Sequence, residues 1–237
     1  MSAVLRTESL TRVLPGAVPV TLVEDIDLEI EAGEFVAIMG PSGSGKSSLL
    51  YLLGLLDMPT SGQIWLNGAD TAGLSEDDLA NIRLRKLGFV FQFHFLLAEL
   101  SALDNVLLPV RRLGLLSEKE AVARGLELLG ALGLGDQANK LPSQMSGGQR
   151  QRVAVARALA NDPLIVFADE PTGALDTKAS ENLREIFKGL SRRQKRTIVV
   201  VTHDPNFAKA ADRLLFLVDG KLQPPERAAD LFAVSIR

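Results

Sequence analysis

The sequence predicts an α/β fold in which a mostly parallel sheet is flanked by helices. Continuous apolar runs of strand length occur at 35–39, 164–170 and 197–204, and the last two end in polar residues. Such runs are typical of strands buried on both faces, and the helix-like stretches between them favour parallel pairing. Residues 26–30 alternate apolar and polar side chains, which indicates a smaller antiparallel sheet beside the first.

The remaining elements follow from local sequence signals. In chain order we expect a helix, a strand that turns at Asn67-Gly68, a second strand, a mostly helical region and a hairpin, at 47–56, 63–68, 87–92, 93–160 and 214–222. Within the helical region, Ser117 to Glu120 has capping-box spacing, and Gly133 is a typical helix stop. Another helix is expected to start near Gln149.

We expect these elements to form one unit with a subdomain. The core and the antiparallel sheet would take residues 1–92 and 161–223, a helical subdomain 93–160, and a loosely packed tail 224–237.

Composition excludes several classes of protein. The chain has 237 residues, is 46% hydrophobic and carries a net charge of −3, which argues against a broad nucleic-acid-binding surface. The basic run 192–196 is expected to be the solvated end of a helix. The longest apolar run, 49–56, is far shorter than the roughly 20 residues that cross a bilayer, so the chain is not expected to span a membrane alone. The absence of cysteine and of a signal peptide fits a cytosolic protein.

A glycine-rich loop carries the strongest chemical signal. Residues 40–47, GPSGSGKS, fit the pattern G-x-x-x-x-G-K-[ST] between an apolar strand and a helical run. In this context main-chain N–H groups surround phosphates, Lys46 reaches the β- and γ-phosphates, and the Ser47 hydroxyl ligates Mg²⁺. The candidate nucleotide-binding residues are Gly40, Pro41, Ser42, Gly43, Ser44, Gly45, Lys46, Ser47 and Ser48.

Two adjacent carboxylates, Asp169 and Glu170, end the apolar run LIVFADE. Asp169 is the candidate for holding Mg²⁺, and Glu170 is the candidate general base for an attacking water. A strand that ends in two acids is common, but the upstream phosphate loop gives this pair a specific task. Gln92 and His203 also end strands, and considered singly each is more often a satisfied polar residue than a catalytic one.

A second loop, QMSGGQRQ at 144–151, has a serine and two glycines just before a helical run. Main-chain N–H groups at such a helix start suit an anion. The loop nevertheless contains no lysine that could reach a phosphate. Taken alone, it is an incomplete phosphate site.

Together these motifs resemble the nucleotide-binding subunits of ATP-binding cassette (ABC) transporters. Their order matches the family over about 5–222: GPSGSGKS, Gln92, MSGGQ, LIVFADE, GALD and His203. The resemblance implies a P-loop NTPase core that binds ATP and Mg²⁺ and hydrolyses ATP. It implies that Gln92 senses the γ-phosphate and the metal, that His203 positions the attacking water, and that Asp176 communicates across a dimer. The implied catalytic residues are Glu170, His203 and Gln92, and the implied metal ligands are Ser47, Gln92 and Asp169.

The resemblance also implies a task for the loop without a lysine. In a head-to-tail dimer, Ser146, Gly147, Gly148 and Gln149 would face the γ-phosphate of an ATP held by Lys46 of a second copy. Two departures from the family pattern stand out. Met145 replaces a leucine, and the segment 10–16 offers Val13 or Leu14 where the family often has an aromatic residue on adenine, which implies weaker adenine stacking.

Finer features resemble the LolD/MacB/FtsE-like subgroup, in the segments 40–68, 87–114 and 167–176. This resemblance implies a place at the cytoplasmic face of the inner membrane, bound to membrane permease subunits with extracytoplasmic domains. ATP hydrolysis would power lipoprotein release, efflux or force transmission, and the membrane subunit would determine the cargo. The alternative is FtsE-like control of cell-wall hydrolases. An apolar cluster after Gln92 either receives a short helix of such a subunit or packs inside the helical subdomain. Its members are Phe93, Phe95, Leu96, Leu97 and Leu100.

Other phosphate-loop proteins explain less of the sequence. A nucleotide kinase or a GTPase would leave MSGGQ, Gln92 and His203 without a task, and the guanine-reading N-K-x-D is absent. Cassette proteins that maintain chromosomes have a long coiled coil between the two loops, for which the spacing of Lys46 and Ser146 leaves no room. Cassette proteins that act on ribosomes join two cassettes in one chain, whereas this sequence contains one set of cassette motifs.

Overall fold

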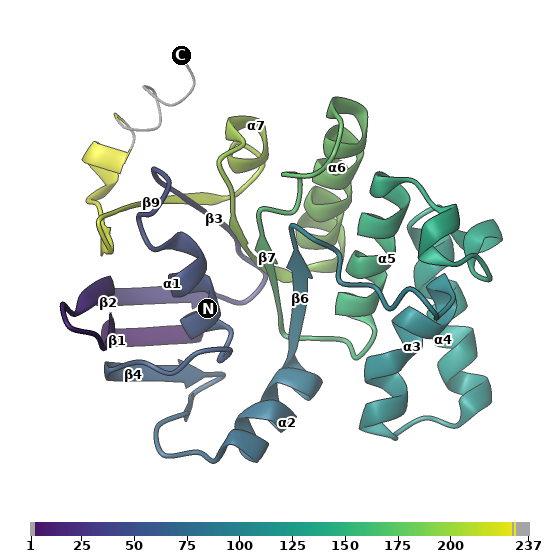
Figure 1. Ribbon diagram of the computed structural model, residues 1–237, viewed down its shortest axis with the longest axis horizontal. Coiled ribbons are helices and arrows are strands. Elements are labelled where there is room, and N and C mark those ends of the chain that lie inside the picture. Colours follow the sequence, from purple (N-terminus) through teal and green to yellow (C-terminus); the bar gives the residue numbers. More distant parts are fainter. Residues whose placement is uncertain (1–2, 229, 231–237) are drawn as a thin grey trace.

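The computed structural model describes residues 3–228 and 230 and contains two sheets (Figure 1). One is four-stranded, in the order β2-β1-β4-β5, and the other is six-stranded, in the order β10-β9-β3-β8-β7-β6. The strands are β1 (Ala3–Leu14), β2 (Val20–Glu31), β3 (Phe35–Met39), β4 (Ser61–Leu66), β5 (Ala69–Asp70), β6 (Leu87–Phe91), β7 (Ile165–Asp169), β8 (Thr197–Val201), β9 (Arg213–Val218) and β10 (Lys221–Leu222). The predicted fold class is confirmed.

The four-stranded sheet is antiparallel throughout. Its strand β1 was not predicted, because polar residues interrupt the alternation and the pairing register shifts more than once along the strand. One irregular point is Ser9, whose φ of 45° is left-handed. The predicted turn between β4 and β5 is confirmed, since Asn67 and Gly68 have φ of 51° and 77°.

The six-stranded sheet is parallel from β9 to β6, and β10 forms the predicted hairpin with β9. Its central strands read as unbroken apolar runs because both faces are covered. In β3, for example, Val36 and Ile38 pack in one core, whereas Ala37 packs in another. The first core lies under α1, α2 and the antiparallel sheet, and the second lies under α3 to α7. The site at the end of these strands is therefore held from both sides.

The helices are α1 (Lys46–Leu53), α2 (Glu76–Lys86), α3 (Ala102–Leu113), α4 (Glu118–Ala131), α5 (Gly147–Leu159), α6 (Thr177–Gln194) and α7 (Pro205–Ala208), with 3₁₀ turns at Gly135–Gln137 and Pro142–Gln144. Helix α1 is shorter than predicted because Gly54 caps it and Leu55 adopts a φ of 57°. Helix α2 was not predicted, because it buries only Leu79 and so lacks an apolar stripe.

Capping explains the helix ends in the middle of the chain. The capping box of Ser117 with Glu120 is confirmed, and α4 stops just before Gly133, whose φ is 68°. Helix α5 begins at Gly147, slightly before the predicted start near Gln149, because Ser146 caps it. The basic run is the exposed end of α6, as predicted, except that Arg196 turns back and pairs with Asp162.

Two further observations concern the chain as a whole. Among the described residues, no helix is both long and apolar enough to cross a membrane. Much of the tail predicted to pack loosely, 224–237, lies outside the described residues, and within the described part Ala228 is buried at 4% exposure.

Substitution of Phe167 tests the packing of the first core. This side chain is fully buried in β7 and stacks on Phe89 with ring centroids 5.7 Å apart. Phe167→Ala should lower the free energy of unfolding by about 3–5 kcal/mol, measured by urea denaturation. Phe93→Ala is the matched control, because Phe93 is 62% exposed and its loss should change stability little. Equal effects of the two changes would contradict this packing.

Candidate functional site

The phosphate loop joins β3 to α1 and lies close to the main chain of both sheets. A Cβ at Gly40 would lie 2.0 Å from the carbonyl oxygen of Leu217, and one at Gly45 would lie 2.0 Å from that of Leu22. Both glycines also have positive φ, 152° and 95°. No other residue type fits either position, so these glycines fix where the loop runs.

The start of α1 is open, in contrast to the other helices. Its N-cap, Gly45, offers no side-chain hydrogen bond, whereas a side chain caps each other α-helix in the described part of the chain. The Lys46 ammonium folds over the loop and donates to the carbonyls of Gly40 and Pro41 at 3.0 and 2.8 Å. Burial lowers the pKa of Lys46, and the nearby carboxylates of Glu170 and Asp169 partly oppose this. Free N–H groups and a cation thus meet at one place, as an anion site requires.

Asp169 ends β7 beside α1 and is almost buried, at 9% exposure. Its Oδ1 accepts a hydrogen bond from Ser47 Oγ, and its Oδ2 accepts one from the Tyr51 hydroxyl, each at 2.9 Å. Hydroxyl and carboxylate oxygens suit Mg²⁺, which is commonly held by one or two carboxylates and the phosphates of a nucleotide. The residues present therefore fit this metal. Sequence reasoning missed Tyr51, although its spacing of four residues from Ser47 on one helix could have indicated it.

Glu170 and His203 form a pair at the same edge of the sheet. Glu170 Oε2 accepts the main-chain N–H of His203 at 3.1 Å and lies 2.8 Å from His203 Nδ1. Glu170 has a left-handed φ of 45°, which turns its side chain away from the line of β7. Gln92 joins this group, because a Cβ at Gly173, one turn after Glu170, would lie 2.8 Å from Gln92 Nε2. The structure therefore brings together the predicted Lys46, Ser47, Asp169, Glu170, His203 and Gln92.

The second loop lies elsewhere. Ser146 Oγ accepts the Gln149 N–H at 3.2 Å, and Gln149 Oε1 accepts the Ser146 N–H at 2.8 Å, which makes a capping box at the start of α5. Ser146, Gly147, Gly148 and Asp176 line a pocket of about 610 Å³ that contains none of the phosphate-loop residues. In Figure 1, β6 and β7 lie between α1 and α5. One copy of the chain therefore keeps its two loops apart.

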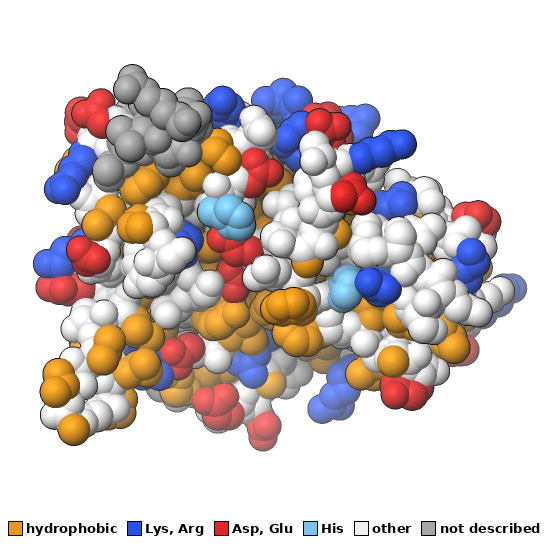
Figure 2. All heavy atoms as spheres, turned by 45° about the horizontal axis from the view of Figure 1, so that its top comes forward, with side chains coloured by type: hydrophobic (Ala, Val, Ile, Leu, Met, Phe, Trp, Pro, Cys, Tyr) orange, Lys and Arg blue, Asp and Glu red, His pale blue; other side chains and the backbone are white. Residues whose placement is uncertain are grey.

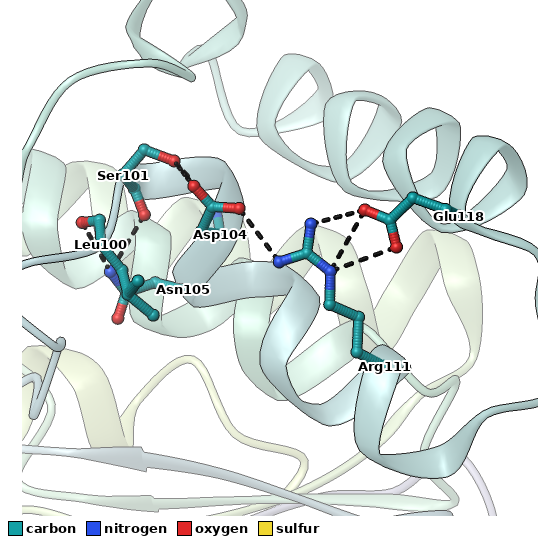
Figure 3. Close-up of polar contacts among 6 residues, drawn as sticks. All are labelled: Leu100, Ser101, Asp104, Asn105, Arg111 and Glu118. Atoms are coloured by element: carbon teal, nitrogen blue, oxygen red, sulfur yellow. Dashed lines mark hydrogen bonds and ion pairs between the residues drawn. The ribbon is translucent and has the colours of Figure 1, made fainter.

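The loop after Gln92 is held by hydrogen bonds to Asn105 of α3, while part of the loop faces solvent. Fully buried Asn105 accepts from Leu97 N–H and donates to the carbonyl of Leu97. It also donates to the carbonyls of Leu100 and Ser101 (Figure 3). On the same helix, Arg111 bridges Asp104 and Glu118 and so ties α3 to the start of α4. Sequence reasoning did not single out Asn105, since a polar residue in a helix gives no sign that it is buried.

Two arginines of α5 hold the first part of this loop. Arg157 donates to the carbonyls of His94 and Phe95 at 2.7 Å each, and Arg150 donates to His94 Nε2 at 3.0 Å. Burial first, then these two cations, lower the pKa of His94, which favours the neutral ring that accepts from Arg150. Arg150 also donates to the carbonyl of Met145, next to Ser146. The loop after Gln92 and the loop that contains Ser146 are thus linked within the chain through Arg150 of α5.

The apolar cluster after Gln92 divides into an exposed and a packed part. Phe93, Phe95 and Leu97 are 62%, 63% and 49% exposed. Leu96 packs against the core, and Leu100 is half-buried. Figure 2 shows hydrophobic side chains exposed on the same face as both histidines. The packing interpretation holds for Leu96, whereas docking of a membrane subunit at the exposed Phe93, Phe95 and Leu97 stays a prediction.

The two departures from the family pattern have simple structural settings. Met145 is buried at 5% exposure in the second core, where another apolar side chain of similar volume would also pack. Val13 and Leu14 end β1; Val13 is half-buried, and Leu14 is 40% exposed.

Comparison with known proteins identifies the family of the chain. A family described as "ABC transporter" matches residues 23–173. The chain is 50% identical to the lipoprotein-releasing system ATP-binding protein LolD 1 of Chlorobium chlorochromatii, over 85% of this chain and 82% of that protein. It is 47% identical to LolD of Aquifex aeolicus, over 94% of this chain and 97% of that protein. It is also 49% identical to the macrolide export ATP-binding/permease protein MacB of Marinobacter nauticus, over 87% of this chain and 32% of that larger protein.

Among solved structures, the chain is similar to an ATP-binding cassette of Methanocaldococcus jannaschii, a dimer in a post-hydrolysis state bound to ADP and Pi. The TM-score is 0.86 at 43% identity, over 93% of this chain and 97% of that one. Sequence, motifs and fold agree, and the chain belongs to the ABC transporter family, as an ATPase subunit of the LolD and MacB type.

Proposed function

We propose that the chain binds and hydrolyses ATP as a head-to-tail dimer and thereby powers lipoprotein release, export or force transmission through separate membrane subunits. The observation that carries this proposal is the separation of the two loops. One copy has an open phosphate loop with its lysine and carboxylates, and on another surface a helix start that has no lysine. Two copies placed head to tail would complete each site.

Within one copy, the residues at the sheet edge divide the chemistry. Main-chain N–H groups of the phosphate loop and Lys46 would bind the β- and γ-phosphates, and Ser47, Asp169 and Gln92 would hold Mg²⁺. When bound, this metal neutralises phosphate charge. Glu170 would take the proton of the attacking water. His203 contacts Glu170 through Nδ1, and because the His203 side chain is 70% exposed, its other ring nitrogen would be open to the γ-phosphate.

The second copy would supply the positive end of the α5 helix dipole rather than a charged side chain. The capping box uses the N–H groups of Ser146 and Gln149, so those of Gly147 and Gly148, in the first turn of α5, remain for an anion. The helix dipole adds a contribution of about 0.3–1 kcal/mol for an exposed anion. The Ser146 hydroxyl accepts from Gln149 N–H, and its own hydrogen remains for a phosphate oxygen. The dimeric cassette similar to this chain supports such an assembly.

The partner would be an integral membrane permease with an extracytoplasmic domain, with this chain bound at the cytoplasmic face of the inner membrane. The MacB relative, named an ATP-binding/permease protein, supports the permease partner. The docking surface would consist of exposed Phe93, Phe95 and Leu97 and of an adjoining cleft of about 380 Å³ lined by Phe91, Pro109 and other residues of β6, α2, α3 and α5. This surface lies between the proposed core (1–92 and 161–223) and the proposed helical subdomain (93–160), a division that stays a prediction.

Removal of the general base tests the catalytic assignment. Glu170→Gln should lower ATP turnover by about 10²–10⁴-fold, because the amide cannot accept the proton of water. ATP binding should survive, and an ATP-bound dimer should accumulate in size-exclusion chromatography. Glu127→Gln, the same change on an exposed residue of α4, is the control. Normal turnover of Glu170→Gln would contradict the assignment.

A charge placed at the start of α5 tests the contribution from a second copy. Ser146→Arg should abolish hydrolysis while monomers still bind ATP normally. Ser117→Arg removes the same kind of capping box from α4 and should leave turnover intact. Mixing Ser146→Arg with Lys46→Ala, each inactive alone, should restore part of the activity, because mixed dimers contain one complete site. Loss of ATP binding by Ser146→Arg monomers, or no recovery on mixing, would refute the role in trans.

Capture of the membrane subunit tests the docking surface. Phe95→Asp should weaken recovery of the permease when the tagged chain is purified from detergent-solubilised membranes. Leu126→Asp places the same charge at a 42% exposed leucine of α4 and should have no effect. Equal recovery of the permease with Phe95→Asp and with the unchanged chain would place the interface elsewhere. Identification of the permease would also separate transport from an FtsE-like role.

A further inference from the structure

The Tyr51 hydroxyl has no task in the function proposed so far. It donates to Asp169 Oδ2 at 2.9 Å, while Ser47 Oγ donates to Oδ1 of the same carboxylate at 2.9 Å. Ser47 and Tyr51 are four residues apart on α1 and so lie on one face of the helix. That face meets the end of β7. Two donors from one rigid helix therefore occupy the two oxygens of one carboxylate.

The surroundings of the contact fix its geometry. Asp169 is 9% exposed, so water replaces a lost partner poorly. The Tyr51 ring packs against the first core, and its main-chain carbonyl accepts from Leu56 N–H at 2.8 Å. The phenol is partly exposed, and it nevertheless points at the carboxylate. A phenol keeps its proton at neutral pH, so the Tyr51 hydroxyl can donate to this carboxylate.

We propose that Tyr51 is a positioning residue that holds Asp169 in the orientation in which it binds Mg²⁺. By occupying Oδ2, the phenol leaves Oδ1 facing Ser47 and the phosphate loop. Hydrogen-bonding partners of metal-binding carboxylates commonly tune metal affinity in this way. The inference rests on the proposed metal site of Ser47 and Asp169.

Metal binding to the nucleotide complex gives the direct test. The full chain is titrated with Mn²⁺ in the presence of ADP, and free Mn²⁺ is followed by electron paramagnetic resonance. Tyr51→Phe keeps the ring and removes only the hydroxyl, and it should weaken Mn²⁺ binding about tenfold. ADP affinity in EDTA should not change, because the phosphate loop is untouched.

A matched control separates this effect from a general loss of packing. Thr71→Val removes another side-chain hydroxyl that donates within the fold, to the carbonyl of Ile64 at 2.9 Å, away from the phosphate loop. It should leave Mn²⁺ affinity unchanged. Thermal unfolding of both variants in EDTA shows whether each is folded.

Tyr51 is the single tyrosine of the chain, so its spectrum is unambiguous. Resonance Raman bands of the phenol should show a hydrogen-bond donor both without ligand and with Mg²⁺ and ADP. Unchanged Mn²⁺ affinity in Tyr51→Phe, or loss of the donor signal when Mg²⁺ and ADP bind, would overturn the inference and leave the proposed site intact. If the unchanged chain with ADP did not bind Mn²⁺, the proposed metal site itself would fail.

Discussion

The active part of this protein depends on how the phosphate loop is held where the two sheets meet. Main-chain hydrogen bonds run from Glu24 N–H in β2 to the carbonyl of Gly220, and from Gly220 N–H to the carbonyl of Ser44, at 2.9 and 3.0 Å. Gly40 and Gly45 complete this contact by letting the loop touch the carbonyls of Leu217 and Leu22. Because these interactions use the main chain, the loop keeps its shape whether or not its side chains are engaged.

The fixed loop determines the direction of α1, and α1 in turn meets the carboxyl ends of the parallel strands. Glu170 N–H donates to the carbonyl of Val201, and Thr202 N–H donates to that of Ile38, so β7, β8 and β3 end in register. Residues just beyond these ends converge because parallel strands place their carboxyl ends at one edge. Each side chain at this edge therefore needs only a short reach to its neighbour.

Elements with a repeating apolar pattern and loops that require glycine can be predicted from the sequence. Residues whose role depends on one contact in the folded chain cannot. Strands buried on both faces are apolar throughout and are easily found, whereas α2 buries only Leu79 and leaves no pattern. The residues of the phosphate loop stand out by their spacing, and the structure brings Glu170 and His203 together as their positions at strand ends suggest. Tyr51 acts through a contact with Asp169, which is distant in sequence, and Asn105 acts through main-chain groups of the irregular loop before it. No periodic pattern reports either contact.

The two helix starts would also explain how the proposed site, divided between two copies, assembles. The start of α1 has no side-chain cap, whereas the start of α5 is capped by Ser146 and Gln149 of its own chain. Helix α5 is therefore ordered before a partner arrives, and assembly does not carry the entropic cost of folding it. Arg150 connects this start to His94, beside the exposed Phe95. In the proposed assembly, a permease bound at that surface would contact a unit that includes the start of α5, so movement of the permease would displace both together.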